Sequence, residues 1–549
     1  MSTLSAGDTA WVLVCAGLVL FMTPGLAAFY GGMVRTRNVL AMLQQNMIAL
    51  GVVSLTWVLV GYTIAFGDDA GSGLFGNLEL FGLTGLKVPP APNLHVVDGR
   101  ITIPTLAFVA FQMMFAVITP ALVTGATAGR LRFAGWVLFL AVWSIVVYAP
   151  VAHWLWHPDG WLARFGTQDW AGGLVVHASA GAAVLAVLLV VGRRRDWPHT
   201  AAPPNSIPLT IVGAGILWFG WFGFNGGDGL QANGVAAQAL INTHLAAAAA
   251  MLVWLALERV TDGHSTVVGG VSGAVAGLAT VTPTAGYVNV LSAVAIGALA
   301  GLVCHLALKL KYLLRLDDAL DVLAVHFVGG MLGTLLLGFF GNSGVNPLGK
   351  DGLLLGGGGS LLWHQLVGVV CVVAFSFVLT WLIAAAIQAL VGLRAPADTQ
   401  ERLDQAQQGA DAYHLGGVTS LVAPGGPQRR PGPAADRAGP PAPPQPGART
   451  RLVSALLEPN RVTNTGELRD ALLRAGAISV IVTDTAAATS EPERRLLPRG
   501  YWQEQPLLAR LQVTVLVGSD AVRGVLDELE RLGAGRAETY VQEAERMPS

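Results

Sequence analysis

Two histidines in similar apolar surroundings are the residues of this sequence best suited to chemistry. His177 lies in VVHASAG and His326 in AVHFVGG, so both strings read Val-His-x-x-x-Gly. A histidine inside an apolar span is costly and usually faces a bundle interior or a water-filled path. For one histidine alone, a hydrogen bond between helices is the more ordinary explanation. Matching positions in two spans favour a shared functional site instead.

The surroundings of the two histidines limit what could pass them. Asp169 precedes the first histidine and Asp321 the second, and we expect a structural role for both. No apolar span of the sequence contains an acidic run suited to Na⁺ or an arginine ladder that would sense voltage. A path lined by apolar and aromatic groups opposes a bare cation but not a small neutral molecule. The sequence therefore favours a substrate that can shed its charge.

The elements that must position these histidines are membrane helices. A hydrocarbon core about 30 Å thick requires roughly 20 apolar residues per helix, and such stretches recur up to residue 394. Eleven are predicted, centred near Leu18, Val53, Phe115, Ala141, Leu185, Ile216, Ala247, Val275, Ala295, Met331 and Val373. If spans 1–5 and 6–10 are homologous halves, an odd number of helices per half gives them opposite topology. The two histidines would then meet near the membrane midplane.

Composition separates two parts of the 549-residue chain. It is 53% hydrophobic and only 12% charged, which argues against an ordinary soluble protein. Residues 1–394 hold 16 Lys/Arg and 15 Asp/Glu, whereas residues 395–549 hold 17 and 19. The net charge of −1 gives no support for nucleic-acid binding. The three scattered cysteines suit neither a disulfide framework nor a metal site.

Charge in the loops predicts orientation, because Lys and Arg are retained on the cytoplasmic side. One set of alternate loops carries eleven basic residues and the other set only four. We therefore expect a multi-pass protein of the cell membrane with its N-terminus outside and everything after Arg394 in the cytoplasm.

Four strings carry a resemblance to a known family. They are TPGLAAFYGGMVRTRNVL at 23–40, DWAGGLVVHASAG at 169–181, GWFGFNGG at 220–227 and DDALDVLAVHFVGG at 317–330. With them, the chain resembles the ammonium transporter (Amt/Mep/Rh) family over about residues 8–415. The resemblance implies a homotrimer in the lipid membrane with one pore per subunit, no enzymatic activity and no cofactor for transport. It also implies that ammonium loses its proton and crosses as ammonia past the two histidines, with the proton following separately.

The resemblance assigns roles residue by residue. Phe115 and Phe224 match the stacked phenylalanine gate, and Trp156 and Phe111 match the aromatic cage that recruits the cation, although ordinary membrane packing would also explain such aromatics. Asp169 matches an acidic residue that is structural in the family. Asp228 departs from the family's serine; it either attracts cations to the outer vestibule or turns away to cap the next loop.

The cytoplasmic tail divides into three parts. The transporter domain covers residues 1–394, residues 395–422 match the family's cytoplasmic C-terminal segment, and residues 423–448 form a Pro/Gly-rich linker. From 449 to 549 the pattern of strands and helices is β-α-β-β-α-β, which predicts a ferredoxin-like α+β domain.

This last domain resembles the PII signal-transduction family over about residues 450–546. Such proteins are trimers that bind adenine nucleotides, and some insert a loop into ammonium transporter pores, so the domain is expected to contact the cytoplasmic face of the pore. Arg510, Gly533, Gly535 and Arg536 are the candidate nucleotide-binding residues, although the stretch from 533 to 536 also fits a tight turn between helix and strand.

Two functions from different classes follow. The first is an ammonium transporter regulated in cis by a fused PII-like domain. The alternative is an ammonium sensor whose membrane domain signals through the PII-like domain with little flux. An enzyme has weak support, because the sequence shows neither a nucleophile with its base nor a metal cluster.

Overall fold

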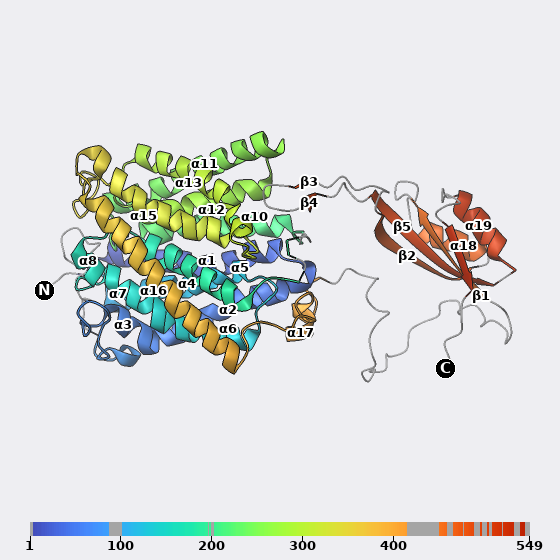
Figure 1. The fold of residues 1–549 in the computed structure, drawn as a ribbon, viewed down its shortest axis with the longest axis horizontal. Helices are drawn as coiled ribbons and strands as arrows, with labels where there is room; N and C mark the ends of the chain where they lie inside the picture. Colours follow the sequence, from blue (N-terminus) through green and yellow to red (C-terminus); the bar gives the residue numbers. More distant parts are fainter. Residues whose placement is uncertain are drawn as a thin grey trace. The chain divides into compact units, whose positions relative to one another are not determined.

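The computed structural model describes two compact units, and each is considered by itself (Figure 1). The described residues are 4–86, 101–195, 197–198 and 203–413 in the first unit. In the second they are 450–457, 465–475, 477–487, 495–496, 502–503, 508–518, 520–531 and 539–543. The proposed linker at 423–448 lies outside the described residues.

The first unit is a bundle of apolar helices. Ten helical stretches among the described residues are long and apolar enough to cross a membrane, and α12 (Val267–Val281) is a shorter apolar helix between two of them. With α12 they correspond in order to the eleven stretches expected from hydropathy. The expectation of a multi-pass α-helical membrane protein is therefore confirmed.

The elements of the bundle fall into two runs along the chain. The first run contains α1 (Ala6–Met33), η1 (Thr36–Asn38), α2 (Val39–Thr56), η2 (Trp57–Gly61), α3 (Tyr62–Phe66), η3 (Phe81–Leu83), α4 (Thr105–Ala121), α5 (Val123–Ala126), α6 (Phe133–Trp143), η4 (Ser144–Tyr148), α7 (Ala149–Trp156), α8 (Trp161–Phe165), η5 (Gly173–Ala178) and α9 (Ser179–Val191). The second contains α10 (Ile207–Gly226), α11 (Gly234–Asp262), α12, α13 (Val290–Ala307), α14 (Leu310–Leu313), η6 (Leu323–Val328), α15 (Gly329–Phe340), η7 (Leu353–Leu355), α16 (Ser360–Leu390) and α17 (Leu403–Gln408).

Four of these helices contain a π-helical turn, namely η2, η4, η5 and η6. His177 lies in η5, which continues into α9, and His326 lies in η6, which continues into α15. Such turns shift the side chains that follow them around the helix axis and occur frequently at functional sites.

Loops that carry arginines are joined to one another at the end of the bundle where Figure 1 places α17. Arg132 donates from Nη1 to the Val391 carbonyl at 2.8 Å, and Arg394 donates to the Arg193 carbonyl at the same distance. At this end the segment after α16 returns to the start of α2. The Asp404 carboxylate in α17 accepts bonds from the Leu40 and Ala41 amides at 3.0 and 2.8 Å, and so satisfies donors that a helix N-terminus leaves open.

The second unit contains a four-stranded antiparallel sheet in the order β2-β5-β1-β6. The strands are β1 (Thr450–Leu457), β2 (Ala477–Ala487), β5 (Leu508–Gly518) and β6 (Thr539–Glu543), and the helices are α18 (Thr465–Arg474) and α19 (Val522–Arg531). Valines of β1 and β5 form a buried core with leucines and a valine from the two helices. A short pair, β3 (Arg495–Leu496) and β4 (Trp502–Gln503), lies in the chain between β2 and β5.

Candidate functional site

The two histidines predicted from the sequence are in direct contact in the membrane unit. The Nδ1 atoms of His177 and His326 lie 3.3 Å apart, and the ring centroids are separated by 5.2 Å. Both side chains are buried. A hydrogen bond between two Nδ1 atoms needs one donor and one acceptor, so when both rings are neutral only one of them can carry its proton on Nδ1. Within the described part of the protein, Nε2 of His177 has no hydrogen-bond partner.

The glycine of each Val-His-x-x-x-Gly string explains how the histidines come so close. A Cβ atom added at Gly330 would lie 2.7 Å from both the His177 Cβ and the Gly173 carbonyl oxygen. In the other string, a Cβ at Gly181 would collide with Phe327. Each glycine therefore admits the segment that carries the opposite histidine, as small residues do between membrane helices.

An aspartate holds the start of each histidine-bearing segment. Asp169 accepts from the amides of residues 173, 174 and 175 at 2.6 to 3.0 Å. Asp318 accepts from Val322 and Leu323 at 3.1 and 2.7 Å. Burial raises the pKa of Asp169 to about 6, although these three N–H groups lower it.

Asp318 is thus the counterpart of Asp169. The sequence had suggested Asp321 instead, and that pairing was wrong. Asp169 and Asp318 each lie eight positions before their histidine. Asp321 instead corresponds to Gly172, and both have positive φ, at 63° and 109°. Aspartate tolerates this conformation better than most residues, and an ion pair with Lys311 at 2.6 Å holds its side chain.

A row of aromatic rings leads to the histidines. The Phe115 and Phe224 centroids are 4.3 Å apart with the rings tilted by 37°. Phe115 also contacts Phe111 at 4.9 Å and Trp156 at 5.7 Å, both edge to face. His177 lies nearly parallel to Phe224, with centroids 6.1 Å apart. The four aromatic residues named from the sequence are therefore brought together on one side of the histidine pair.

Asp228 is also buried, in the loop between α10 and α11. Its negative charge contributes to the raised pKa of Asp169. The N-terminus of α11 is capped by Asn233, whose side chain accepts from Val235 and Ala236. Asp228 is therefore not the cap of that helix.

Cavities continue from the histidines toward the arginine-rich end. The cavity lined by both histidines has a volume of about 10 Å³, which has room for roughly one water. It shares Phe29 and His326 with a second cavity of about 60 Å³. The second shares Met33, Ala319 and Leu320 with a third of about 200 Å³. The three cavities therefore lie in succession from the histidine pair to the arginine-rich end, and neighbouring cavities have lining residues in common.

Two residues of the site were missed in the sequence. Trp221 stacks on His177 with centroids 5.5 Å apart, and its Nε1 donates to Thr282 Oγ1 at 2.9 Å. Trp221 could have been found in the sequence because it lies three residues before Phe224, and residues three apart share one face of a helix. Asp318 could have been found because Asp169 and Asp318 each lie eight residues before a histidine.

Of the nucleotide-binding candidates in the second unit, Arg510 lies in β5, while Gly533, Gly535 and Arg536 lie outside the described residues. Among the residues that the structure does describe, no group of three or more His, Cys, Asp or Glu is arranged to hold a metal ion.

Comparisons with known proteins agree with this geometry. The model of the Ammonium Transporter Family matches residues 10–413. The ammonium transporter of Mycobacterium tuberculosis is 44% identical over 447 residues, which cover 77% of this chain and 94% of the relative. That of Bacillus subtilis is 42% identical over 409 residues, covering 74% and 98%. The crystal structure of Saccharomyces cerevisiae Mep2 superimposes with a TM-score of 0.67 at 34% identity, over 72% of this chain and 91% of Mep2. The chain belongs to the ammonium transporter family.

Proposed function

We propose that the protein conducts ammonium across the cell membrane by passing ammonia through a pore that His177 and His326 line. The contact between the two Nδ1 atoms carries this proposal. A hydrogen bond between the two Nδ1 atoms would place one proton between the rings, and Nε2 of His177 has no protein partner in the described chain. The two rings thus offer a neutral ammonia a hydrogen-bonding path through otherwise apolar walls.

The row of aromatic rings would bind ammonium before it loses its proton. Phe111 and Trp156 would attract the cation through their ring faces, an effect of roughly 0.5–2 kcal/mol. Phe115 and Phe224 are in contact and would close the path until a substrate separates them. Asp228 would add negative charge on the side of the histidine pair where the aromatic rings lie, and its charge contributes to the raised pKa of Asp169.

We further propose an N-terminus outside, a homotrimer and two halves of opposite topology. The gathering of arginine-bearing loops at one end supports the orientation. The repeated order of aspartate cap, π-helical turn, histidine and glycine supports the two halves.

We propose that the second unit is a ferredoxin-like, PII-like module that regulates transport in cis. The strand order β2-β5-β1-β6 with two crossover helices supports the ferredoxin-like assignment. An adenine nucleotide is the ligand to test, with Arg510, Gly533, Gly535 and Arg536 as the residues to change. The boundaries proposed are 1–394 for the transporter, 395–422 for the cytoplasmic segment, 423–448 for the linker and 449–549 for the module.

A second candidate function is ammonium sensing with little flux. A solved structure described as "Sensor Amt Protein" superimposes with a TM-score of 0.66 at 29% identity, over 73% of this chain and 98% of that one. An additional unit after the membrane domain would give such a sensor an output.

The deciding experiment measures ammonium-evoked current of the full chain in proteoliposomes, with and without ATP, ADP and AMP. Transport predicts a current, and His177→Ala or His326→Ala should lower the preference for ammonium over potassium. His264→Ala, at an exposed position between α11 and α12, is the matched control. Ammonium binding without current would favour the sensor. Unchanged selectivity in both histidine variants would refute the histidine pore.

Nucleotide control is tested by deleting residues 423–549. The shortened chain should keep its current and lose any response to nucleotide, since the family match ends at residue 413. A nucleotide response that survives the deletion would contradict regulation by the module.

A further inference from the structure

We propose that Arg130 is a positioning residue for the histidine pair, because its guanidinium links the end of the His177-bearing helix to the segment that precedes the His326-bearing helix. Arg130 lies in the loop between α5 and α6, and its described hydrogen bonds go to Gly192, Ala126 and Asp317 rather than to a histidine. Its side chain is fully buried. The inference deepens the proposed pore and rests on it for its transport readout.

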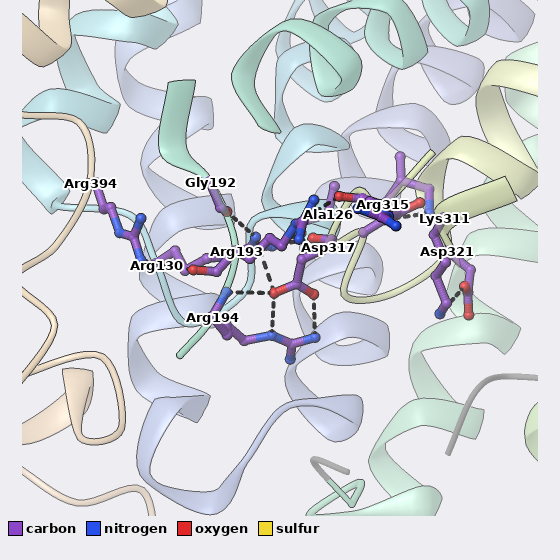
Figure 2. Close-up of polar contacts among 12 residues, drawn as sticks. Ala126, Arg130, Gly192, Arg193, Arg194, Lys311, Arg315, Asp317, Asp321 and Arg394 are labelled. Atoms are coloured by element: carbon purple, nitrogen blue, oxygen red, sulfur yellow. Dashed lines mark hydrogen bonds and ion pairs between the residues drawn. The ribbon is translucent and has the colours of Figure 1, made fainter. Parts of the chain in front are cut away.

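The guanidinium contacts three segments at once (Figure 2). Nη1 donates to the Gly192 carbonyl at 2.7 Å and lies 3.4 Å from a carboxylate oxygen of Asp317. Nη2 donates to the backbone carbonyl of Asp317 at 2.7 Å and to that of Ala126. The planar fork of arginine suits this task, because its donors point in fixed and different directions.

One of these contacts holds the helix of His177. Gly192 is the C-cap of α9, and η5 and α9 form one continuous helical stretch from Gly173 to Val191. The bond from Arg130 therefore fixes the end of the helix whose beginning carries His177. A helix is stiff along its axis, so a shift at Gly192 would move His177 as well.

The other contact holds the approach to His326. Asp317 is followed directly by Asp318, which accepts from the amides of Val322 and Leu323 at the start of η6. His326 lies in that same turn. A displacement of the Asp317 backbone would therefore move the adjacent Asp318, and with it the start of η6 and His326.

Arg194 contacts Asp317 as well, but in a different way. It donates from its backbone amide, Nε and Nη2 to the Asp317 carboxylate at 2.6 to 2.9 Å. Its side chain is 28% exposed, whereas that of Arg130 is wholly enclosed. Both arginines face the Asp317 carboxylate, and Arg130 in addition spans from Asp317 to the end of α9.

The histidine contact has little tolerance for movement. At 3.3 Å the two Nδ1 atoms are already near the upper limit of a hydrogen bond. Lysine keeps the positive charge at position 130 but has one nitrogen, so it cannot reach the Gly192 and Asp317 carbonyls in the same geometry. Arg130→Lys should therefore loosen the histidine pair while leaving the buried ion pair largely in place.

The test combines spectroscopy and transport on the full chain. In protein labelled with ¹⁵N-histidine, solid-state NMR should detect coupling between the two Nδ1 nitrogens, assigned by its loss in His177→Ala. Arg130→Lys should abolish this coupling. A displacement approaching 1 Å should also lower maximal ammonium current by about tenfold to a hundredfold. The ammonium concentration for half-maximal current should stay within about twofold, because the aromatic row is untouched.

Arg132→Gln is the matched control, since Arg132 lies two residues away, is exposed and bonds to the Val391 carbonyl. It should keep both the coupling and the current. If Arg130→Lys fails to fold, Arg130→Gln tests the same link, because a single side-chain amide cannot donate to both the Gly192 and the Asp317 carbonyls in the geometry of the guanidinium, and it should reduce the coupling. Coupling that persists in a folded Arg130→Lys, or in Arg130→Gln where that replaces it, would overturn the positioning role. Loss of coupling with unchanged current would leave that role standing and refute the proposed pore.

Discussion

The sharpest test of how the histidines are brought together is Gly330→Ala. The added methyl would lie 2.7 Å from the His177 Cβ and from the Gly173 carbonyl, whereas ordinary contacts begin at 3.4 Å, so one side must retreat by about 0.7 Å. Overpacking of this kind typically costs about 1–3 kcal/mol. Because the obstacles are a backbone carbonyl and the histidine itself, we expect the histidines to separate. Maximal ammonium current should fall by at least about tenfold.

The control is Gly51→Ala in α2, where an added Cβ meets no atom within 4 Å. Alanine is a better helix former than glycine by about 0.5–1 kcal/mol, so this variant should be at least as stable and fully active. Both variants would be compared by thermal unfolding in detergent and by current in proteoliposomes. Normal current and stability in Gly330→Ala would refute the argument that this glycine sets the distance between the histidines.

Three further predictions concern other contacts. Asp404→Ala removes the acceptor of two α2 amides and should cost about 0.5–2 kcal/mol, measured by thermal unfolding; an unchanged transition would contradict the capping role. Burial alone would raise the pKa of Asp317, but Arg130 and Arg194 hold it below its usual range. The ionised carboxylate therefore stabilises the fold above about pH 4, and this contribution is lost as the pH falls below that value. Asp317→Asn should make thermal stability decline less steeply below about pH 4. A decline as steep as in the unaltered protein would count against this role of the carboxylate. Phe224→Leu should lower the ammonium to potassium current ratio, because it removes an aromatic contact with Phe115 worth about 0.5–1.5 kcal/mol; a ratio equal to that of the unaltered protein would exclude a gating role.

Hydropathy and repetition made the membrane helices and the histidine pair predictable. The apolar stretches had to be long enough to cross a membrane, and two identical spacings of histidine and glycine pointed to one site. The aromatic row followed from the resemblance to the ammonium transporter family. Its mutual contacts, with Phe115 touching Phe111, Trp156 and Phe224, required the structure.

Other features could not be predicted because their cause lies in tertiary contacts. The π-helical turns have no residue type of their own, since their wider hydrogen-bonding pattern depends on the surrounding packing. Asp318 was overlooked because Asp321 is nearer to His326 in the chain. Arg130 counted in the sequence only as one positive charge among eleven, because the two partners that give it a positioning role, Gly192 and Asp317, lie 62 and 187 residues away.

The bonds between α17 and the start of α2 can form only late in the synthesis of the protein. The amides at the start of α2 leave the ribosome early, but the Asp404 carboxylate that accepts from Ala41 follows 363 residues later. At a synthesis rate of roughly 5–20 residues per second, these donors would wait on the order of 20 to 70 s for their partner. During that interval water or lipid headgroups must satisfy them. The arginine-rich end of the bundle is thus completed last, and a nascent chain stopped before residue 404 would carry every membrane helix with this end still unsealed.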